Sequence, residues 1–216
     1  VISIVEDEKD LNELVKRYLE REGYEVRSYL TFDEASVHST DEDVHLWILD
    51  IMLGDKSGFD LIDEIRACNP DVPVISISGD GGFQMNSQEL ATAVLEELPI
   101  ISCIFNNNNL GMVRQWQKLF YGKRYSMTCL RSGAACRGKC GEVECPTYTP
   151  DFMKLADSYG AKGIHITKKE DIEPAFREAM KSTKTPYILE FDIDPEDLVY
   201  PMVKPGGTLE DLIMDC

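Results

Sequence analysis

Carboxylates follow two short apolar runs near the start of the chain. VISIV at 1–5 leads into Glu6 and Asp7, and HLWIL at 45–49 leads into Asp50. If the two runs are neighbouring parallel strands, about 4.8 Å apart, their carboxyl ends bring the three carboxylates together. Such a group can share one Mg²⁺, and an aspartate beside the metal can accept a phosphoryl group. The alternative is that these acids only cap helices or face solvent.

A second group of polar residues surrounds a glycine-rich turn. GDGG at 79–82 follows the apolar run PVISIS and precedes a helix-period segment. Residues without a Cβ let backbone amides approach a phosphate, and the amino end of a helix favours the anion. Asp80 lies in this turn, and the next apolar run, IISCIF, leads into four asparagines at 106–109. Carboxylate, amide and diphosphate oxygens together predict a Mg²⁺ site.

Four of the seven cysteines crowd into one irregular segment: Cys129, Cys136, Cys140 and Cys145. Four thiolates can close a tetrahedral zinc site or hold an iron–sulfur cluster. The spacing C-x6-C-x3-C-x4-C lacks a close C-x2-C pair, so two disulfides or four reduced thiols stay open as alternatives. The three histidines, His38, His45 and His165, are distant from this segment in sequence and are predicted to be surface or core residues.

The elements that position these residues alternate between strands and helices. Short apolar runs are bounded by turn residues at 1–5, 24–29, 45–50, 73–78 and 100–105. Amphipathic segments such as DLNELVKRYLEREG and SQELATAVLEEL lie between them. This alternation predicts an α/β fold with a doubly wound parallel sheet. The pattern stops in an irregular Cys-rich loop and resumes with TPDFMKLADSYG, where Thr149 is expected to cap the helix.

Three of the motifs together resemble the receiver domain of bacterial response regulators. They are IVEDE, LDIMLGDKSGFDLIDEIR and PVISIS, and the resemblance covers residues 1–78. It implies a flavodoxin-like first half with a Mg²⁺-dependent phosphoacceptor site. The implied site consists of Asp50 as phosphoacceptor, Glu6, Asp7 and the carbonyl of Met52 at the metal, and Ser78 at the phosphoryl group. A histidine kinase is the implied partner, although the family's last strand with its lysine and its last helix do not appear.

From about residue 79 the chain is similar to thiamine-diphosphate enzymes, and closely to the large catalytic subunit of acetolactate synthase. The motifs that show this similarity are GDGGFQMNSQELATA, NNNNLGMVRQWQKLFYGKRYS, TPDFMKLADSYGA and VYPMVKPGG. This resemblance implies Mg²⁺ and thiamine diphosphate as cofactors. The implied Mg²⁺ ligands are the side chains of Asp80 and Asn107 and the backbone of Asn109. The implied residues at the cofactor and the substrate entrance are Gly81, Gly82, Gly111, Met112 and Trp116.

The reaction of that family decarboxylates pyruvate and condenses the product with a second 2-oxo acid, in branched-chain amino-acid biosynthesis. Its cofactor lies between two subunits, and the glutamate that activates the cofactor ring sits in an N-terminal domain that this sequence does not contain. Whether the chain is an enzyme by itself is therefore left open, and a homo-oligomer or a synthase-like partner chain is implied. For Met112 and Trp116 the alternative is simple burial of an amphipathic helix against its own sheet.

The apolar run at 73–78 fits both resemblances, as the fourth strand of a receiver and as the strand before GDG. We therefore predict a hybrid of receiver-like βα units at 1–78 and a thiamine-diphosphate-binding half at 79–216. One hypothesis places both halves in one sheet of order 2-1-3-4-5, so that Asp50 and Asp80 share one edge. The alternative is two units with separate sites.

The composition excludes some partners. The chain has 39 acidic residues against 22 Lys and Arg, a net charge of -17, which repels nucleic acid and anionic membrane surfaces. No apolar run approaches the roughly 20 residues that span a bilayer. The first ten residues, VISIVEDEKD, lack the basic and apolar segments of a signal peptide. The sequence thus predicts a cytoplasmic protein with neither a nucleic-acid nor a membrane partner.

Overall fold

A computed structural model describes most of the chain. The described residues are 1–50, 52–69, 73–130, 149–200, 202–203, 206 and 212–213. The chain divides into two compact units, Val1–Val72 and Pro73–Cys216. Each unit is an α/β structure with its own parallel sheet, so each is described by itself.

The first unit contains a three-stranded parallel sheet in the order β2-β1-β3. Its strands are β1 (Ile2–Val5), β2 (Val26–Tyr29) and β3 (Leu46–Leu49). A short antiparallel hairpin follows, formed by β4 (Met52–Leu53) and β5 (Lys56–Ser57). The helices are α1 (Lys9–Arg21), α2 (Phe32–Ser36) and α3 (Gly58–Cys68). In the sheet Val5 pairs with both Tyr29 and Leu49, so the three strands end at one level.

The core of the first unit lies between the sheet and the helices α2 and α3. Its buried residues are Val5, Phe32, Ala35, Leu53, Leu61 and Ile65. Helix α3 begins at a capping box, in which the side chain of Ser57 accepts the Phe59 N–H and the side chain of Asp60 accepts the Ser57 N–H. This start fixes the phase of the helix, so that Leu61 and Ile65 face the sheet.

The second unit contains a four-stranded parallel sheet in the order β6-β7-β9-β8. Its strands are β6 (Val74–Gly79), β7 (Ile100–Asn106), β8 (Lys162–Ile166) and β9 (Tyr187–Asp192). Its helices are α4 (Asp80–Met85), α5 (Glu89–Leu95), α6 (Gly111–Phe120), α7 (Phe152–Tyr159) and α8 (Ile172–Ala179), with a 3₁₀ turn at Lys169–Asp171. Two short strands near the carboxyl end, β10 (Met202–Val203) and β11 (Leu212–Ile213), pair antiparallel.

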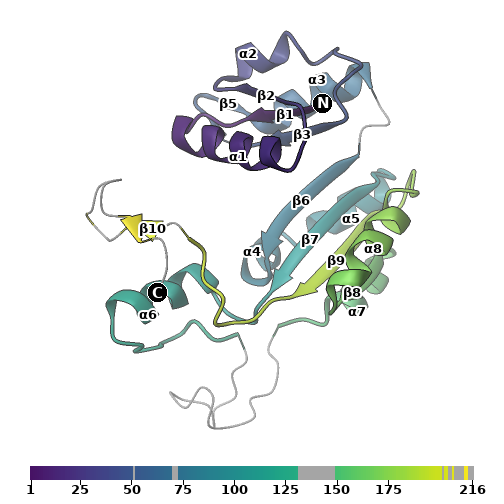
Figure 1. The fold of residues 1–216 in the computed structure, drawn as a ribbon. Coiled ribbons are helices and arrows are strands. Elements are labelled where there is room, and N and C mark those ends of the chain that lie inside the picture. The colour runs from purple at the N-terminus through teal and green to yellow at the C-terminus, as the bar shows by residue number, and fades with distance from the viewer. Residues whose placement is uncertain are drawn as a thin grey trace. The chain divides into compact units, whose positions relative to one another are not determined.

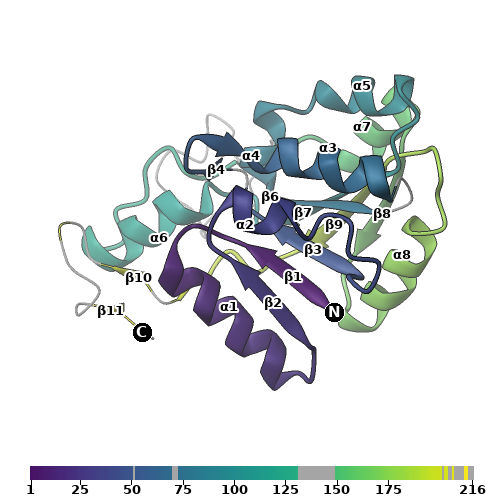
Figure 2. The ribbon, with the colours of Figure 1, turned by 90° about the horizontal axis from the view of Figure 1, so that it is seen from above.

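Helices cover both faces of this four-stranded sheet (Figures 1 and 2). On one face α8 packs on a core that includes Cys103, Ala175 and Leu189. On the other face α5 and α7 pack on a core that includes Ile104 and Phe152. Alternate residues of β7 and β9 point to opposite faces, and both sets include buried side chains, as expected for a doubly wound parallel sheet.

The structure confirms the α/β fold with parallel sheets and overturns two finer predictions. The single merged sheet is wrong, because β3 lies in the three-stranded sheet β2-β1-β3 whereas β6 lies in the four-stranded sheet β6-β7-β9-β8. Pairing with β7 uses only one edge of β6, and in the described residues its other edge does not pair with β3. Thr149 is not the cap of α7. Asp151 caps it by accepting the Lys154 N–H, and the Thr149 hydroxyl donates to Asn108 instead.

None of the helices in the described part of the chain is long and apolar enough to cross a bilayer.

Candidate functional site

The carboxyl ends of β6 and β7 bring the GDG turn beside the asparagine run. Gly79 pairs with Phe105, so Asp80 follows β6 at the level where Asn106 ends β7. Neighbouring strands are about 4.8 Å apart, which places the two polar segments within reach of one ligand. Functional groups collect at this edge in open α/β sheets. Register alone therefore assembles the two motifs that the sequence predicted as one site.

Asp80 is a buried carboxylate that lacks a full set of partners. Its residue is 1% exposed, and its Oδ2 atom has no hydrogen-bond partner among the described residues. Burial raises the pKa of Asp80 to about 6, against the opposing effect of hydrogen bonds from backbone amides, including those of Gly81 and Asn108. A buried carboxylate oxygen without a counter-charge costs free energy unless a cation or a proton meets it. The chemistry of Asp80 thus fits a divalent cation.

The asparagine run forms a tight turn that is held by its own side chains. Asn107 Oδ1 accepts the Asn109 N–H at 2.9 Å, and Asn109 Nδ2 donates to the Asn107 carbonyl at 2.7 Å. Asn108 adopts a left-handed φ of 56°, which asparagine tolerates better than most residues. Asn109 Oδ1 is buried without a partner among the described residues. Two orphaned buried oxygens, one on Asp80 and one on Asn109, thus lie in the two segments that the sequence assigned to Mg²⁺.

The glycines of this region differ in how much space they leave. A Cβ at Gly111 would lie 2.9 Å from Asn107 Nδ2, so a larger residue would push on a predicted Mg²⁺ ligand. A Cβ at Gly81 would lie 2.7 Å from Leu110 Cδ2, the end of a flexible side chain. A Cβ at Gly82 would meet only Ser78, at 4.0 Å. Of these three positions, Gly111 is therefore the one where a side chain would most directly displace a predicted Mg²⁺ ligand, Asn107.

Helix α6 presents apolar side chains outward. Met112 is 70% exposed and Trp116 is 37% exposed, whereas the buried residue of this helix is Gln115. Simple burial against the sheet therefore does not describe Met112, whereas Trp116 is mostly covered and packs edge-on against Phe120 of the same helix. A cavity of about 260 Å³ lies between α6 and residues that follow β9, such as Val199 and Met202, and Asn107, Gly111 and Met112 line it.

The first unit brings together the three acids at the ends of β1 and β3. Ligand atoms of Glu6, Asp7 and Asp50 lie within 4.8 Å of one another. The loop that carries the acid pair is pinned by Asn12, whose Nδ2 donates to the carbonyls of Glu6 and Tyr29. Burial, and then the charges of the two aspartates, raise the pKa of Glu6. Repulsion within such a cluster is relieved by a cation.

The other predicted site residues lie in further elements of the two units. Met52 pairs with Ser57 in the β4–β5 hairpin, and Ser78 lies in β6 of the second unit, paired with Ile104. Ser78 is therefore in a different sheet from β1 and β3. Cys129 forms a β-bridge with Asn109. Cys136, Cys140 and Cys145 lie outside the described residues, so zinc or an iron–sulfur cluster at the four cysteines stays a hypothesis.

Sequence reasoning missed a third polar cluster, formed by His165, Glu190 and Asp192. His165 of β8 pairs in register with Glu190 of β9, and Asp192 follows on the same face of β9. His165 Nε2 and Asp192 Oδ1 are 2.9 Å apart. The runs GIHIT and PYILEFDI predict two strands, but their local pattern holds no signal for which residues pair, and the register creates the cluster.

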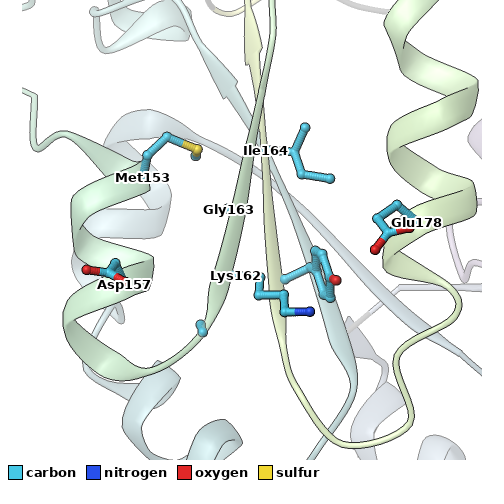
Figure 3. Close-up of a pocket in the computed structure, with 8 residues that line it drawn as sticks. Met153, Asp157, Lys162, Gly163, Ile164 and Glu178 are labelled. Carbon is cyan, nitrogen blue, oxygen red and sulfur yellow. The ribbon is translucent and has the colours of Figure 1, made fainter.

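A second cavity, of about 410 Å³, lies around the edge strand β8. Met153 and Asp157 reach it from α7, and Glu178 lies across the strand on α8 (Figure 3). Lys162 of β8 sits over the ring of Tyr187, 5.5 Å from its centroid. This mixed lining holds no set of converging groups comparable to the strand-end clusters.

Comparison with protein families identifies both halves. The family model “Thiamine pyrophosphate enzyme, C-terminal TPP binding domain” matches residues 56–191, and the chain belongs to this family. The model of the response regulator receiver domain matches residues 2–96, so a receiver domain is present as well. The two matches overlap over 56–96, a range that includes the apolar run at 73–78 that fits both resemblances.

The curated relatives are acetolactate synthase large subunits, as the sequence predicted. “Probable acetolactate synthase large subunit” of Methanocaldococcus jannaschii is 44% identical over 156 residues, 72% of this chain and 23% of the relative. Acetolactate synthase isozyme 2 large subunit of Escherichia coli K12 is 39% identical over 148 residues, 68% of this chain and 24% of the relative. The chain thus spans about a quarter of the length of these relatives. Family and relatives together support thiamine diphosphate with Mg²⁺ as the cofactors.

Among solved structures, the thiamine diphosphate-dependent 4-hydroxybenzoylformate decarboxylase of Rhodococcus jostii RHA1 is similar over 63% of this chain and 23% of its own, with a TM-score of 0.46 and 23% identity.

Proposed function

We propose that the second unit binds Mg²⁺ and thiamine diphosphate as one half-site of an acetolactate synthase-like enzyme. The observation that carries the proposal is Asp80, a buried carboxylate with an orphaned oxygen, at the strand end beside the asparagine turn. Asp80 and the side chain of Asn107 would hold Mg²⁺, together with the backbone of Asn109. The bound cation would in turn neutralise the diphosphate.

The remaining contacts follow from the same edge of the sheet. Gly81 and Gly82 lie in the first turn of α4, where their backbone amides would contact the diphosphate. Gly111 and Met112 would line the cofactor from α6. Trp116 would shape the substrate entrance, since it is partly exposed on the same helix. A 2-oxo acid is the proposed substrate class, and thiamine diphosphate supplies the carbanion stabilisation for its decarboxylation and condensation.

Turnover requires a group that activates the cofactor ring, and we assign that group to a partner. The relatives are named large subunits, and this chain spans about a quarter of their length. A synthase-like chain is the proposed source of that group. A homo-oligomer is proposed separately, as a form of self-association.

Calorimetric titration with thiamine diphosphate, with and without Mg²⁺, tests the half-site. We expect Mg²⁺-dependent binding that weakens at least about tenfold in Asp80→Asn, because a metal ligand loses its charge. Asp171→Asn is the matched control, since Asp171 is an exposed acid remote in sequence from both motifs. Equal binding by wild type and Asp80→Asn, or no binding by the wild type, would overturn the proposal.

The cluster in the first unit supports a second function, a phosphoacceptor module. We propose that Asp50 accepts a phosphoryl group while Glu6, Asp7 and the Met52 carbonyl hold Mg²⁺, with a histidine kinase as the donor partner. Three acids within 4.8 Å favour this, together with the receiver match. The proposed role of Ser78 is to contact the phosphoryl group.

Incubation with acetyl phosphate and Mg²⁺, followed by intact mass, tests the phosphoacceptor function. We expect one added phosphoryl group on the wild type and on Asp63→Asn, an exposed acid of α3, and none on Asp50→Asn. Phosphorylation that persists in Asp50→Asn would exclude Asp50 as the acceptor.

A further inference from the structure

Three metal-ligating side chains converge on the strands β8 and β9, outside both sites described above. Ligand atoms of His165, Glu190 and Asp192 lie within 4.8 Å of one another. His165 and Glu190 are paired in register, and Asp192 is two residues further along β9, so all three project from one face of the sheet. Two hydrogen-bonded strands hold the ligands, which makes the arrangement more rigid than one built on loops.

Apart from His165 itself, no cationic side chain in the described ranges pairs with the two carboxylates of this cluster. Glu190 is 8% exposed and takes part in no ion pair there, and Asn106 Nδ2, a neutral donor, bonds its Oε1 at 2.7 Å. Asp192 pairs only with His165 within the same ranges. A buried carboxylate beside a second carboxylate is costly unless a cation joins them.

A second histidine–aspartate pair shows what a balanced arrangement looks like. His38 Nδ1 and Asp41 Oδ2 are also 2.9 Å apart, but Arg27 bonds the same oxygen at 3.0 Å. Arg27 also pairs with Asp43, so this cluster carries its own cation. The His165 cluster has the same histidine–aspartate distance as the His38 pair. It also contains the buried carboxylate of Glu190, and no arginine of the described residues pairs with it.

We propose that His165, Glu190 and Asp192 bind a borderline divalent cation such as Zn²⁺, with a ligand set that does not include Asp80. One imidazole nitrogen and two carboxylate oxygens are a ligand set that Zn²⁺ accepts at about 2.0–2.2 Å, with water in the fourth position. The set suits Mg²⁺ less well, because Mg²⁺ prefers oxygen ligands alone. The exposed side chains of His165 and Asp192 can rotate to close the site around the ion, while Glu190 is fixed by Asn106. The bound ion ties the edge strand β8 to β9.

Co²⁺ is the probe for the test, because its visible spectrum distinguishes nitrogen and oxygen ligands from thiolates. The full chain is first treated with iodoacetamide to block accessible cysteines. Excess Mg²⁺ is present, since it occupies the oxygen sites at Asp80 and Asp50 but competes poorly for imidazole. Affinity and stoichiometry are measured by calorimetry alongside the spectrum.

We expect one Co²⁺ per chain, no thiolate charge-transfer band, and at least about tenfold weaker binding in His165→Gln. Asp192→Asn should weaken binding similarly. His38→Gln is the matched control and should bind as the wild type does. Asp80→Asn should also bind Co²⁺ normally, which separates this site from the proposed cofactor site.

The effect of Zn²⁺ on the thermal stability of the chain is a second measurement, which does not depend on the Co²⁺ titration of a variant. Zn²⁺ should raise the Tm of the alkylated wild type, because an ion that binds only the folded chain stabilises it. The shift should disappear in His165→Gln. Unchanged Co²⁺ affinity in His165→Gln, or loss of binding in Asp80→Asn in place of His165→Gln, would overturn the proposal.

Discussion

Gln115 holds the backbone of Val199 by two hydrogen bonds. Its amide nitrogen donates to the Val199 carbonyl at 2.7 Å, and its Oε1 accepts the Val199 N–H at 3.0 Å. Glu196 reinforces the attachment by pairing with Arg114 and Lys118, which lowers the pKa of Glu196. The segment after β9 is therefore fastened along α6, and together they enclose the smaller cavity.

Gln115→Met should release this segment. Methionine has a similar size but can replace neither bond, so the Val199 backbone loses about 1–3 kcal/mol of local stabilisation. We expect amide exchange of residues 196–200 to become about tenfold faster or more in hydrogen–deuterium exchange. Gln88→Met, an exposed glutamine just before α5, is the control. Unchanged exchange would mean that the salt bridges of Glu196 are sufficient.

Asp80 should make the stability of the cofactor-free chain depend on pH. Its folded pKa of about 6 lies above the ordinary 3.8, so the folded state binds a proton that the unfolded state releases. The free energy of unfolding should therefore fall as pH rises from about 4 to about 6, by at most about 3 kcal/mol from this group. Urea denaturation at a series of pH values measures it.

The contribution of Asp80 is isolated by comparison with Asp80→Asn. The many other carboxylates also change stability with pH, and the difference between the two proteins removes their effect. As pH rises, the free energy of unfolding of Asp80→Asn should increase relative to that of the wild type, because asparagine does not ionise. A constant difference across this range would contradict the raised pKa.

Gly163→Ala should strain the contact between α7 and β8. The added Cβ would lie 2.8 Å from Met153 Sδ and 3.4 Å from its Cα, so the Met153 side chain must leave its present position or the helix and the strand must separate (Figure 3). We expect a loss of about 1–3 kcal/mol of stability. In a Met153→Ala background, part of the clash is removed and the same glycine change should cost less. Additive effects of the two substitutions would show that the contact is already relaxed.

Cys103 should resist alkylation in the folded chain. It is 2% exposed, and burial raises the pKa of its thiol to about 11, so very little thiolate exists at pH 8. We expect iodoacetamide to label the exposed Cys68 first and Cys103 only after unfolding in urea, as read by peptide mass. Labelling of both at the same rate in the absence of urea would show that the core opens readily.

The sequence was sufficient for features that depend on local pattern. Alternating apolar and helix-period segments predicted the parallel α/β units, and the GDG turn and the asparagine run fall at strand ends. Those strand ends meet because β6 and β7 are neighbours in sequence order and also in the sheet. Consecutive strands in α/β folds commonly pair, so this step needed no three-dimensional information.

Features that depend on distant partners were not predictable. Asp151 and Thr149 are both residue types that commonly cap helices. Asp151 caps α7, because the Thr149 hydroxyl is bonded to Asn108, 41 residues away. The merged sheet failed because no local signal tells whether β6 also pairs with β3. The cluster at His165 depends on a register between β8 and β9, which pattern alone does not fix.

The sequence of β6 has a consequence for the solubility of the purified chain. Val74–Gly79 reads VISISG, without charge or proline, and in the described part of the chain it pairs along one edge only, with β7. Ile77 at its centre is 69% exposed. Uncharged, β-branched edge strands are templates for intermolecular strand addition and aggregation. Repulsion from the net charge of -17 opposes such contacts, so acidification or high salt should be the conditions under which the chain first precipitates.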